Sequence, residues 1–310
     1  MTDTASPSLP EANKPSSGVF VIDHSSLAMF KECPQKYKFA IVDGYRLTTA
    51  APPLAFGSAY HDGLEAFDRA IARGLDREAA LIASIRSALR HTLPPGDTAR
   101  TRETLIRALV WHEEHYRHDF AETWILPNGK PAVELSFRIE LPFSFSHSDL
   151  PVLYCGHIDK IVSYQGRLFA MEHKHTKSAL SDFYWLRYTF SSQISGYHLA
   201  AEASFSAEIG GAIIDATQVG VNFVRFGRRM ATRVKAHQQE WLLDTHYWLE
   251  QLNSSFSTNR WPHNHESCGK YGGCQFRDVC FASPLVRDSV LRSHYRVEHW
   301  DPLRVRGEEE

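Results

Sequence analysis

The sequence lacks any apolar run that approaches the roughly 20 residues of a membrane span. Its first 18 residues, MTDTASPSLPEANKPSSG, are polar and rich in serine and proline, without the apolar segment of a signal peptide. We therefore expect no membrane contact and a disordered leader over residues 1–20. A reducing, cytoplasmic location follows from the same absence, so the five cysteines are more easily ligands or buried thiols than disulfides.

The chain also lacks a strong charge imbalance. It has 34 Lys and Arg residues against 36 Asp and Glu residues, a formal net charge of −2 over 310 residues. A nucleic-acid partner would therefore need a local basic groove rather than a basic surface. There is no glycine-rich phosphate loop and no internal repeat, so any ATP-driven motor would have to be a separate partner.

Hydrophobic periodicity changes along the chain from helical to strand-like and back. The segments at residues 24–33, 56–71, 76–90, 101–120, 191–203 and 237–252 have the period of helices, and those at 132–141, 152–164, 167–175 and 219–226 that of strands. This order predicts an α/β protein with a mixed central sheet flanked by helices. We expect a single domain over residues 21–285, with a helical insertion at about 57–125 and a tail at 286–310.

The segment LFAMEHKHTK begins as an apolar strand and ends in charged residues. Side chains two residues apart on a strand share a face, so Glu172 and Lys174 should lie side by side. A simple ion pair at the end of a strand would explain them. However, Asp159 lies on the preceding strand and would meet both residues if the strands form a hairpin. Two adjacent carboxylates repel, and Mg²⁺ or Mn²⁺ would resolve that conflict.

Other polar residues near this segment allow more than one interpretation. His157, His173 and His175 could suggest a zinc site, but strand alternation places His173 and His175 on the face opposite Glu172. Glu134 could approach a metal or be a solvated strand residue. Lys177 could touch phosphate or be a solvated loop residue. His198 is expected to be structural.

The pattern GHID…AMEHK resembles the PD-(D/E)XK nuclease superfamily, in its RecB-like branch. The resemblance implies a restriction-endonuclease-like fold in which Asp159 and Glu172 bind a divalent metal. It implies that Lys174 assists the hydrolysis of a phosphodiester bond. The backbone carbonyl of His173, the variable residue between the two, is expected to complete the protein ligands.

Two further motifs extend the resemblance. FGSAYHDGLEAF is similar to the G-x-x-x-H helix of the branch, which implies that His61 is an additional metal ligand. SQISGY is similar to its Q-x-x-x-Y motif, which implies that Gln193 and Tyr197 line the path of the nucleic acid. These two residues are four apart and share a helix face.

The cysteines form a separate pattern. Cys268, Cys274 and Cys280 are spaced C-x5-C-x5-C, and Cys33 lies far upstream before Pro34. A zinc site and free thiols are alternatives, and Cys155 is most simply a core residue. The set of four resembles the iron–sulfur nucleases of the same branch, which include AddB-type subunits and CRISPR-adaptation nucleases. The resemblance implies a [4Fe–4S] cluster, with its C-terminal ligands in the segment 265–282, that closes the two chain ends.

The leading hypothesis is a metal-dependent DNA nuclease, an exonuclease acting on ends or single strands, for instance in DNA repair. The alternative is a nuclease-fold nucleic-acid-binding subunit that acts only within a larger recombination, repair or CRISPR-adaptation complex, with a helicase or an integrase as partner. The presence of Asp159, Glu172 and Lys174 together disfavours a degenerate, purely binding module.

Overall fold

The computed structural model describes residues 18–48, 51–145, 148–205, 207–270, 273–299 and 301. The leader expected at residues 1–20 therefore lies outside the described residues, except for its last three. The chain forms two compact units, each built from several segments. The first unit comprises Met1–Thr48, Arg138–Gly156 and Gln239–Glu310, and the second comprises Thr49–Phe137 and His157–Gln238.

The second unit contains most of the sheet and five helices of the described chain. Its helices are α3 (Pro52–Ala72), α4 (Arg77–Ala88), α5 (Arg102–His115), α6 (Asp182–Thr189) and α7 (Ser192–Phe205). Its strands are β3 (Glu122–Thr123), β6 (Arg167–Thr176), β7 (Ile209–Val219) and β8 (Val224–Ala231). Strands β4 (Val133–Phe145) and β5 (Ser148–Tyr164) pass from one unit into the other.

The sheet of this unit is mixed, as the sequence predicts. Strands β5 and β6 form an antiparallel hairpin in which Lys160 lies opposite Met171. The turn contains Gln165 and Gly166, both with positive φ, where glycine is strain-free. Strand β7 then pairs parallel to β6, and β8 pairs antiparallel to β7. The predicted pairing of the two strands that carry Asp159 and Glu172 is therefore confirmed.

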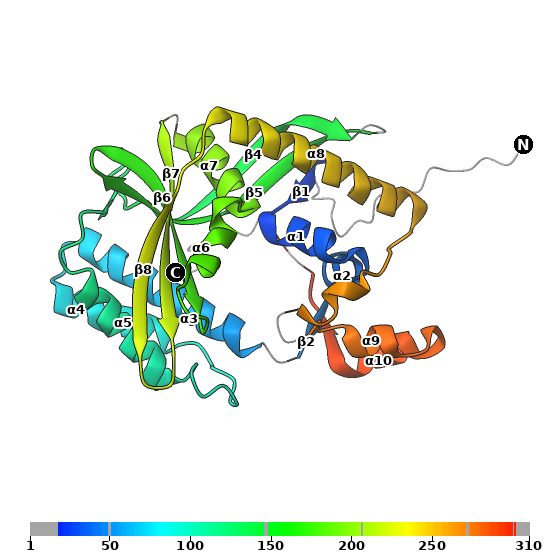
Figure 1. Cartoon of the computed structure of the whole chain (residues 1–310), viewed down its shortest axis with the longest axis horizontal. Coiled ribbons are helices and arrows are strands. Elements are labelled where there is room, and N and C mark those ends of the chain that lie inside the picture. Colours follow the sequence, from blue (N-terminus) through cyan, green and yellow to red (C-terminus); the bar gives the residue numbers. More distant parts are fainter. Residues whose placement is uncertain are drawn as a thin grey trace, which may run out of the picture. The chain divides into compact units, whose positions relative to one another are not determined.

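Helices cover both faces of this sheet (Figure 1). On one face, Tyr60 of α3 shares a hydrogen bond of 2.9 Å with Thr217 of β7, and a buried cluster joins α3, α4 and α5 to β7 and β8. On the other face, Trp185 of α6 lies against Gly227 of β8, where an added Cβ would come within 3.1 Å of the ring. The expected mixed sheet flanked by helices is confirmed.

One strand prediction is wrong. Residues 219–226 do not form a single strand: β7 ends at Val219 and β8 begins at Val224. The intervening turn is closed by a hydrogen bond of 2.9 Å from the amide of Gly220 to the carbonyl of Phe223. Strand β7 escaped prediction because all of its residues are buried, so its sequence lacks the alternation of a half-buried strand.

The first unit gathers segments from both ends of the chain. Its described elements are β1 (Phe20–Ile22), α1 (His24–Glu32), α2 (Pro34–Tyr37), a π-helical turn (Lys38–Val42), β2 (Tyr45–Leu47), two 3₁₀ turns (His265–Ser267 and Pro284–Val286), α9 (Arg277–Phe281), α10 (Arg287–His294) and β9 (Tyr295–Val297). Helix α8 (Lys235–Thr258) enters it from the second unit. Strand β1 pairs parallel with β5, and β2 pairs antiparallel with β9. No described helix combines the length and the apolar character that a bilayer span requires.

Candidate active site

Strand β6 presents Glu172 and Lys174 toward α7, as strand alternation predicts. The Nζ atom of Lys174 donates to Oε1 of Glu172 and, over 3.1 Å, to Oε1 of Gln193. The side-chain amide of Gln193 donates to the same Glu172 oxygen over 2.9 Å. The structure therefore brings three of the predicted site residues into one hydrogen-bonded group.

Asp159 joins this group from the neighbouring strand β5. Its Oδ1 atom lies 3.4 Å from Nδ1 of His61, which helix α3 carries. Its Oδ2 atom accepts a hydrogen bond of 2.7 Å from the backbone amide of His173. The hairpin and α3 thus place Asp159 and His61 beside the strand that carries Glu172, as the hairpin and the resemblance of the α3 motif lead us to expect.

Three potential metal ligands lie within 4.8 Å of one another: His61, Glu134 and Asp159. Glu134 lies on β4 and is buried, which answers the question that its sequence left open between a solvated residue and one near the site. Its φ of 48° is rare for a residue other than glycine, and such conformations concentrate at functional sites. Glu172 lies outside this compact group.

The charges of the site alter one another's proton affinity. Burial and the nearby Asp159 carboxylate raise the pKa of Glu172. Burial alone would lower the pKa of Lys174, but the carboxylates of Glu172 and Asp159 together outweigh burial and raise it. Burial alone would lower the pKa of His61 too, but the carboxylates of Asp159 and Glu172 raise it to about 9. By contrast, although burial raises the pKa of Asp159, His61 and Lys174 hold it below its usual range, so Glu172 is the carboxylate whose charge the site compensates least.

The surroundings of one carboxylate oxygen of Glu172 also favour a bound cation. The residue is 4% exposed, and its Oε2 atom is buried without a hydrogen-bond partner among the described residues. A buried carboxylate oxygen without a partner is costly. A divalent cation would supply the missing partner and offset the repulsion between Glu172 and Asp159. The donor set of carboxylates and one imidazole fits Mg²⁺ or Mn²⁺.

The two residues of the Q-x-x-x-Y motif have different surroundings. Gln193 contacts the charged pair of β6 directly, whereas Tyr197 is half-buried and its ring packs edge-on against Phe137, with centroids 5.6 Å apart. His198, expected to be structural, is buried and its Nε2 atom bonds the carbonyl of Ile209 over 2.6 Å. Lys177 forms an exposed ion pair of 3.2 Å with Asp97.

The opposite face of β6 carries a second polar group, which the sequence did not reveal. The Oδ2 atom of Asp215 lies 3.3 Å from Nδ1 of His173, 3.0 Å from Nε2 of His112 and 3.1 Å from an Nη atom of Arg228. This network holds the side chain of His173 away from Glu172 and Lys174. A lone aspartate within the apolar run GGAIIDATQV was the available signal.

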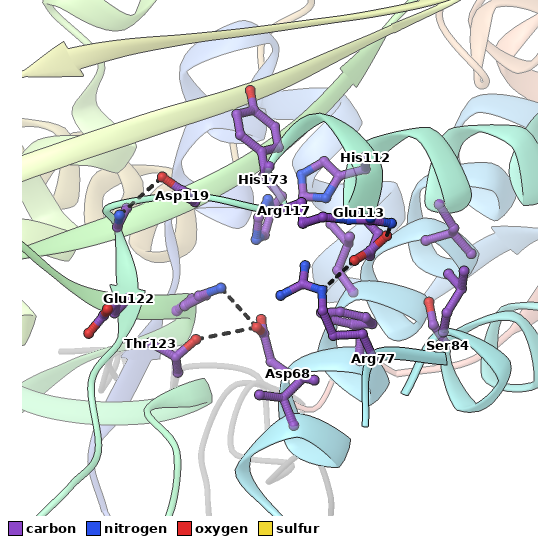
Figure 2. Close-up of a pocket in the computed structure, with 18 of the residues that line it drawn as sticks. Asp68, Arg77, Ser84, His112, Glu113, Arg117, Asp119, Glu122, Thr123 and His173 are labelled. Atoms are coloured by element: carbon purple, nitrogen blue, oxygen red, sulfur yellow. Dashed lines mark hydrogen bonds and ion pairs between the residues drawn. The ribbon is translucent and has the colours of Figure 1, made fainter. Parts of the chain in front are cut away.

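A cavity of about 420 Å³ adjoins this second group (Figure 2). His112 and His173 line it, and most of its other charged side chains are paired, as in the contacts of Arg77 with Glu113 and of Lys160 with Asp68. Asp159, Glu172 and Lys174 do not line it. This cavity is therefore separate from the candidate catalytic residues.

The structure does not assemble the histidine trio that a zinc site would need. His157 contacts Ser136 over 2.9 Å, His173 contacts Asp215, and His175 lies against Phe56. Among the described residues, the groups of three close ligand atoms are the two that contain Asp159 and Asp215.

Four of the five cysteines of the first unit lie together, and the fifth lies apart from them. Cys33, Cys268, Cys274 and Cys280 line one small cavity. No three of these described cysteines have sulfur atoms within 4.8 Å of one another, whereas the sulfurs of a tetrahedral zinc site lie about 3.8 Å apart, given Zn–S bonds of about 2.3 Å. Cys155 is buried elsewhere, and its thiol donates to the carbonyl of Ile22 over 3.3 Å.

The family model of the PD-(D/E)XK nuclease superfamily matches residues 22–281 of this chain. The match covers most of the sequence and includes every residue of the candidate site. The chain therefore belongs to the PD-(D/E)XK nuclease superfamily. No curated protein matches it.

Two solved structures are similar to the chain. A protein from Eubacterium rectale with the provisional name of exonuclease is 12% identical with a TM-score of 0.47, over 80% of this chain and 86% of that one. The protein SSO0001 is 14% identical with a TM-score of 0.38, over 87% of this chain and 89% of that one. At these values the two likenesses carry no functional argument, and the assignment depends on the family match.

Proposed function

We propose that this protein is a divalent-metal-dependent DNA nuclease of the RecB-like branch, an exonuclease that hydrolyses phosphodiester bonds with Mg²⁺ or Mn²⁺. His61, Asp159 and Glu172 are the proposed side-chain ligands, with the backbone carbonyl of His173. Glu134 is a further candidate ligand because it lies within reach of His61 and Asp159.

The observation that carries the proposal is the difference between the surroundings of the two carboxylate oxygens of Glu172. One of its oxygens is held by Lys174 and Gln193, while the other is buried and has no partner among the described residues. A plain ion pair would need only the first oxygen. The second oxygen and the nearby Asp159 carboxylate together favour a cation over the ion-pair alternative.

Each protein group has a distinct proposed task. A bound metal would supply the activated water and neutralise charge on the phosphate. Lys174 keeps its proton because its pKa is raised, so it acts by stabilising negative charge in the transition state rather than as a base. Gln193 orients Lys174 and Glu172 through its two hydrogen bonds.

The test is a cleavage assay on end-labelled single- and double-stranded DNA, with Mg²⁺, with Mn²⁺ and with chelator. We expect progressive shortening from ends with either metal and none with chelator. Asp159→Ala should abolish both cleavage and calorimetric Mn²⁺ binding. Cleavage in chelator, or equal Mn²⁺ binding by the variant, would contradict the proposal.

We also propose that Cys33, Cys268, Cys274 and Cys280 hold a [4Fe–4S] cluster. Two features support this: the four thiols line one cavity, and no three of their sulfur atoms lie as close together as ligands on a single zinc ion would. Cys33 comes from one chain end and the other three from the opposite end, so the cluster would link them. Anaerobically purified protein should be brown, with iron and sulfide near four each per chain. Colourless protein with one zinc ion would refute this.

A further inference from the structure

Helix α6 exposes a row of large apolar side chains. Phe183 is 81% exposed and Phe190 is 86% exposed, and Leu186 between them is also exposed. Leu186, Arg187 and Phe190 follow Phe183 by three, four and seven positions. Phe183, Leu186 and Arg187 therefore share one face of α6, and Phe190, the residue that caps its C-terminus, continues the row just past the end of the helix. We call Phe183, Leu186, Arg187 and Phe190 the α6 stripe. Contiguous exposed apolar groups of this kind mark a binding surface.

Two arginines on or beside α6 have no carboxylate partner among the described residues. The guanidinium of Arg187 lies 4.7 Å from the ring centroid of Tyr184, and that of Arg229 on β8 lies 5.7 Å from the ring of Trp185. Neither forms an ion pair within the part of the chain that the structure describes. By contrast, Arg228 forms ion pairs with Asp119 and Asp215. Guanidinium groups without a carboxylate partner, on the helix that exposes Phe183 and on the neighbouring strand, match the phosphates of a nucleic-acid strand whose bases could stack on the exposed rings.

A groove of about 340 Å³ runs along the flank of α6 that faces β8. Its lining includes Trp185, Leu186 and Arg229. It also includes Arg233, which bonds the hydroxyl of Ser195 over 2.9 Å, and a single acidic residue, Asp182. The groove thus continues the mixture of apolar and cationic groups from the stripe onto the sheet, with two arginines against one aspartate.

The neighbouring face of α6 reaches the candidate active site. Tyr184 and Tyr188 are one helical turn apart, and their hydroxyls share a hydrogen bond of 3.1 Å. Tyr184 interacts electrostatically with Lys174, and Tyr188 with Glu172. Arg233 in the groove donates to the carbonyl of Tyr188 on α6 over 3.3 Å and to Ser195 on α7, the helix whose Gln193 bonds Lys174. A ligand in the groove would therefore lie beside the helix that contacts the catalytic pair.

We propose that the α6 stripe binds unpaired bases of the DNA strand that is cleaved, while Arg187 and Arg229 bind its phosphates. The substrate class is single-stranded DNA or a single-stranded end, because only unpaired bases present a free ring face to Phe183 and Phe190. This inference rests on the proposed nuclease function and adds to it where the substrate strand lies.

The first test measures binding of a fluorescently labelled 20-nucleotide oligothymidylate by anisotropy in metal-free buffer, where cleavage does not interfere. Phe183→Ala and Phe190→Ala should each weaken binding by about 5- to 100-fold, the scale of one lost base–aromatic stack. Phe120→Ala is the matched control, because Phe120 is 82% exposed in the same unit but lies outside α6. It should bind as the wild type does.

The salt dependence of the same binding separates the two kinds of contact. Arg187→Gln should reduce the slope of log affinity against log salt by about 0.7, the value for one phosphate contact with a single strand. The phenylalanine variants should keep the wild-type slope. A matched duplex should bind more weakly than the single strand and respond little to either phenylalanine change.

Three results would overturn the inference. The first is wild-type affinity for the oligothymidylate in both phenylalanine variants, and the second is an equal loss of affinity in Phe120→Ala. The third is a duplex that binds the wild type as tightly as the single strand does and loses as much affinity in the phenylalanine variants. Wild-type affinity in both variants would assign the stripe to a protein partner instead. Cleavage by the wild type with Mn²⁺ is measured separately. Without cleavage the proposed nuclease function fails even if α6 binds the strand, whereas cleavage with normal binding by the variants refutes only the α6 site.

Discussion

The carboxylate site of the second unit and the thiol cavity of the first unit differ in their chemistry and in their origin along the chain. The former combines carboxylates with one imidazole, a set that suits Mg²⁺ or Mn²⁺. The latter has four thiols, a soft set that suits an iron–sulfur cluster. A single chain thus carries one group of ligands for hard cations and another for soft ones, each confined to its own unit.

The two regions also differ in how their ligands are held. Glu172 and Asp159 lie on paired strands of a buried sheet, whose register fixes the distance between them. The thiols are half-buried and come from short segments, with Cys33 just before α2 and Cys280 on α9. Under the proposed functions, the carboxylates would act from a buried sheet of fixed register, whereas the thiols would bind a cluster from short segments at the two ends of the chain.

Lys174→Ala provides the largest contrast between the regions. We expect cleavage to fall by about 10⁴-fold or more, the scale seen when an essential catalytic group is lost, because the ammonium stabilises the transition state. Mn²⁺ binding and the iron content should change little. Single-turnover cleavage and calorimetry check this. Lys177→Ala is the control, because Lys177 is paired with Asp97 at the surface; full activity in Lys174→Ala would exclude Lys174 from the mechanism.

Cys33→Ser should change the cluster and the stability of the protein, which Lys174→Ala should leave nearly unchanged. Losing the link between chain ends should cost about 3–5 kcal/mol of stability in the loop-closure picture, together with the brown colour. Thermal melts and the visible absorbance of anaerobically purified protein measure both effects. Cys155→Ser should keep the colour, since its thiol bonds the carbonyl of Ile22 away from the cavity. A colourless Cys155→Ser protein, or a brown Cys33→Ser protein, would reverse the assignment.

Metal binding at the carboxylate site should depend on pH through His61. The pKa of this imidazole is raised to about 9, so it holds a proton at neutral pH that must leave before the nitrogen can bind a metal. Mn²⁺ affinity should therefore rise by about 10-fold per pH unit between about pH 7 and 9. Calorimetry across this range should show proton release, which His61→Ala should remove. An affinity independent of pH in the wild type would exclude His61 as a ligand.

The smallest predicted effects distinguish Gln193 from Tyr197. Gln193→Ala should slow cleavage by about 10-fold at nearly unchanged melting temperature, since it removes a donor to Glu172. Tyr197→Ala should cost about 2 kcal/mol of stability, because its ring packs against Phe137 and is only half-buried. Thermal melts and cleavage rates on both variants decide this. A stable Tyr197→Ala protein with weakened DNA binding would place that ring in the nucleic-acid path instead.

The amino-acid sequence determined the local part of the site. Strand alternation separates Glu172 and Lys174 from His173, and the turn at Gln165 and Gly166 pairs their strand with that of Asp159. The strand alternation and the turn depend on neighbouring residues and on a period of two residues, and both patterns can be recognised in the sequence. The mixed order of helices and strands was legible for the same reason.

Only the tertiary structure decided which distant residues meet. Strand β7 and its Asp215 were hidden because a fully buried strand has no polar alternation. Glu134 comes within reach of His61 through a backbone conformation that its residue type does not favour. The α6 stripe has the pattern of an ordinary amphipathic helix, and only folding reveals that its apolar side remains exposed. Burial and proximity are properties of the packed chain, so no local pattern encodes them.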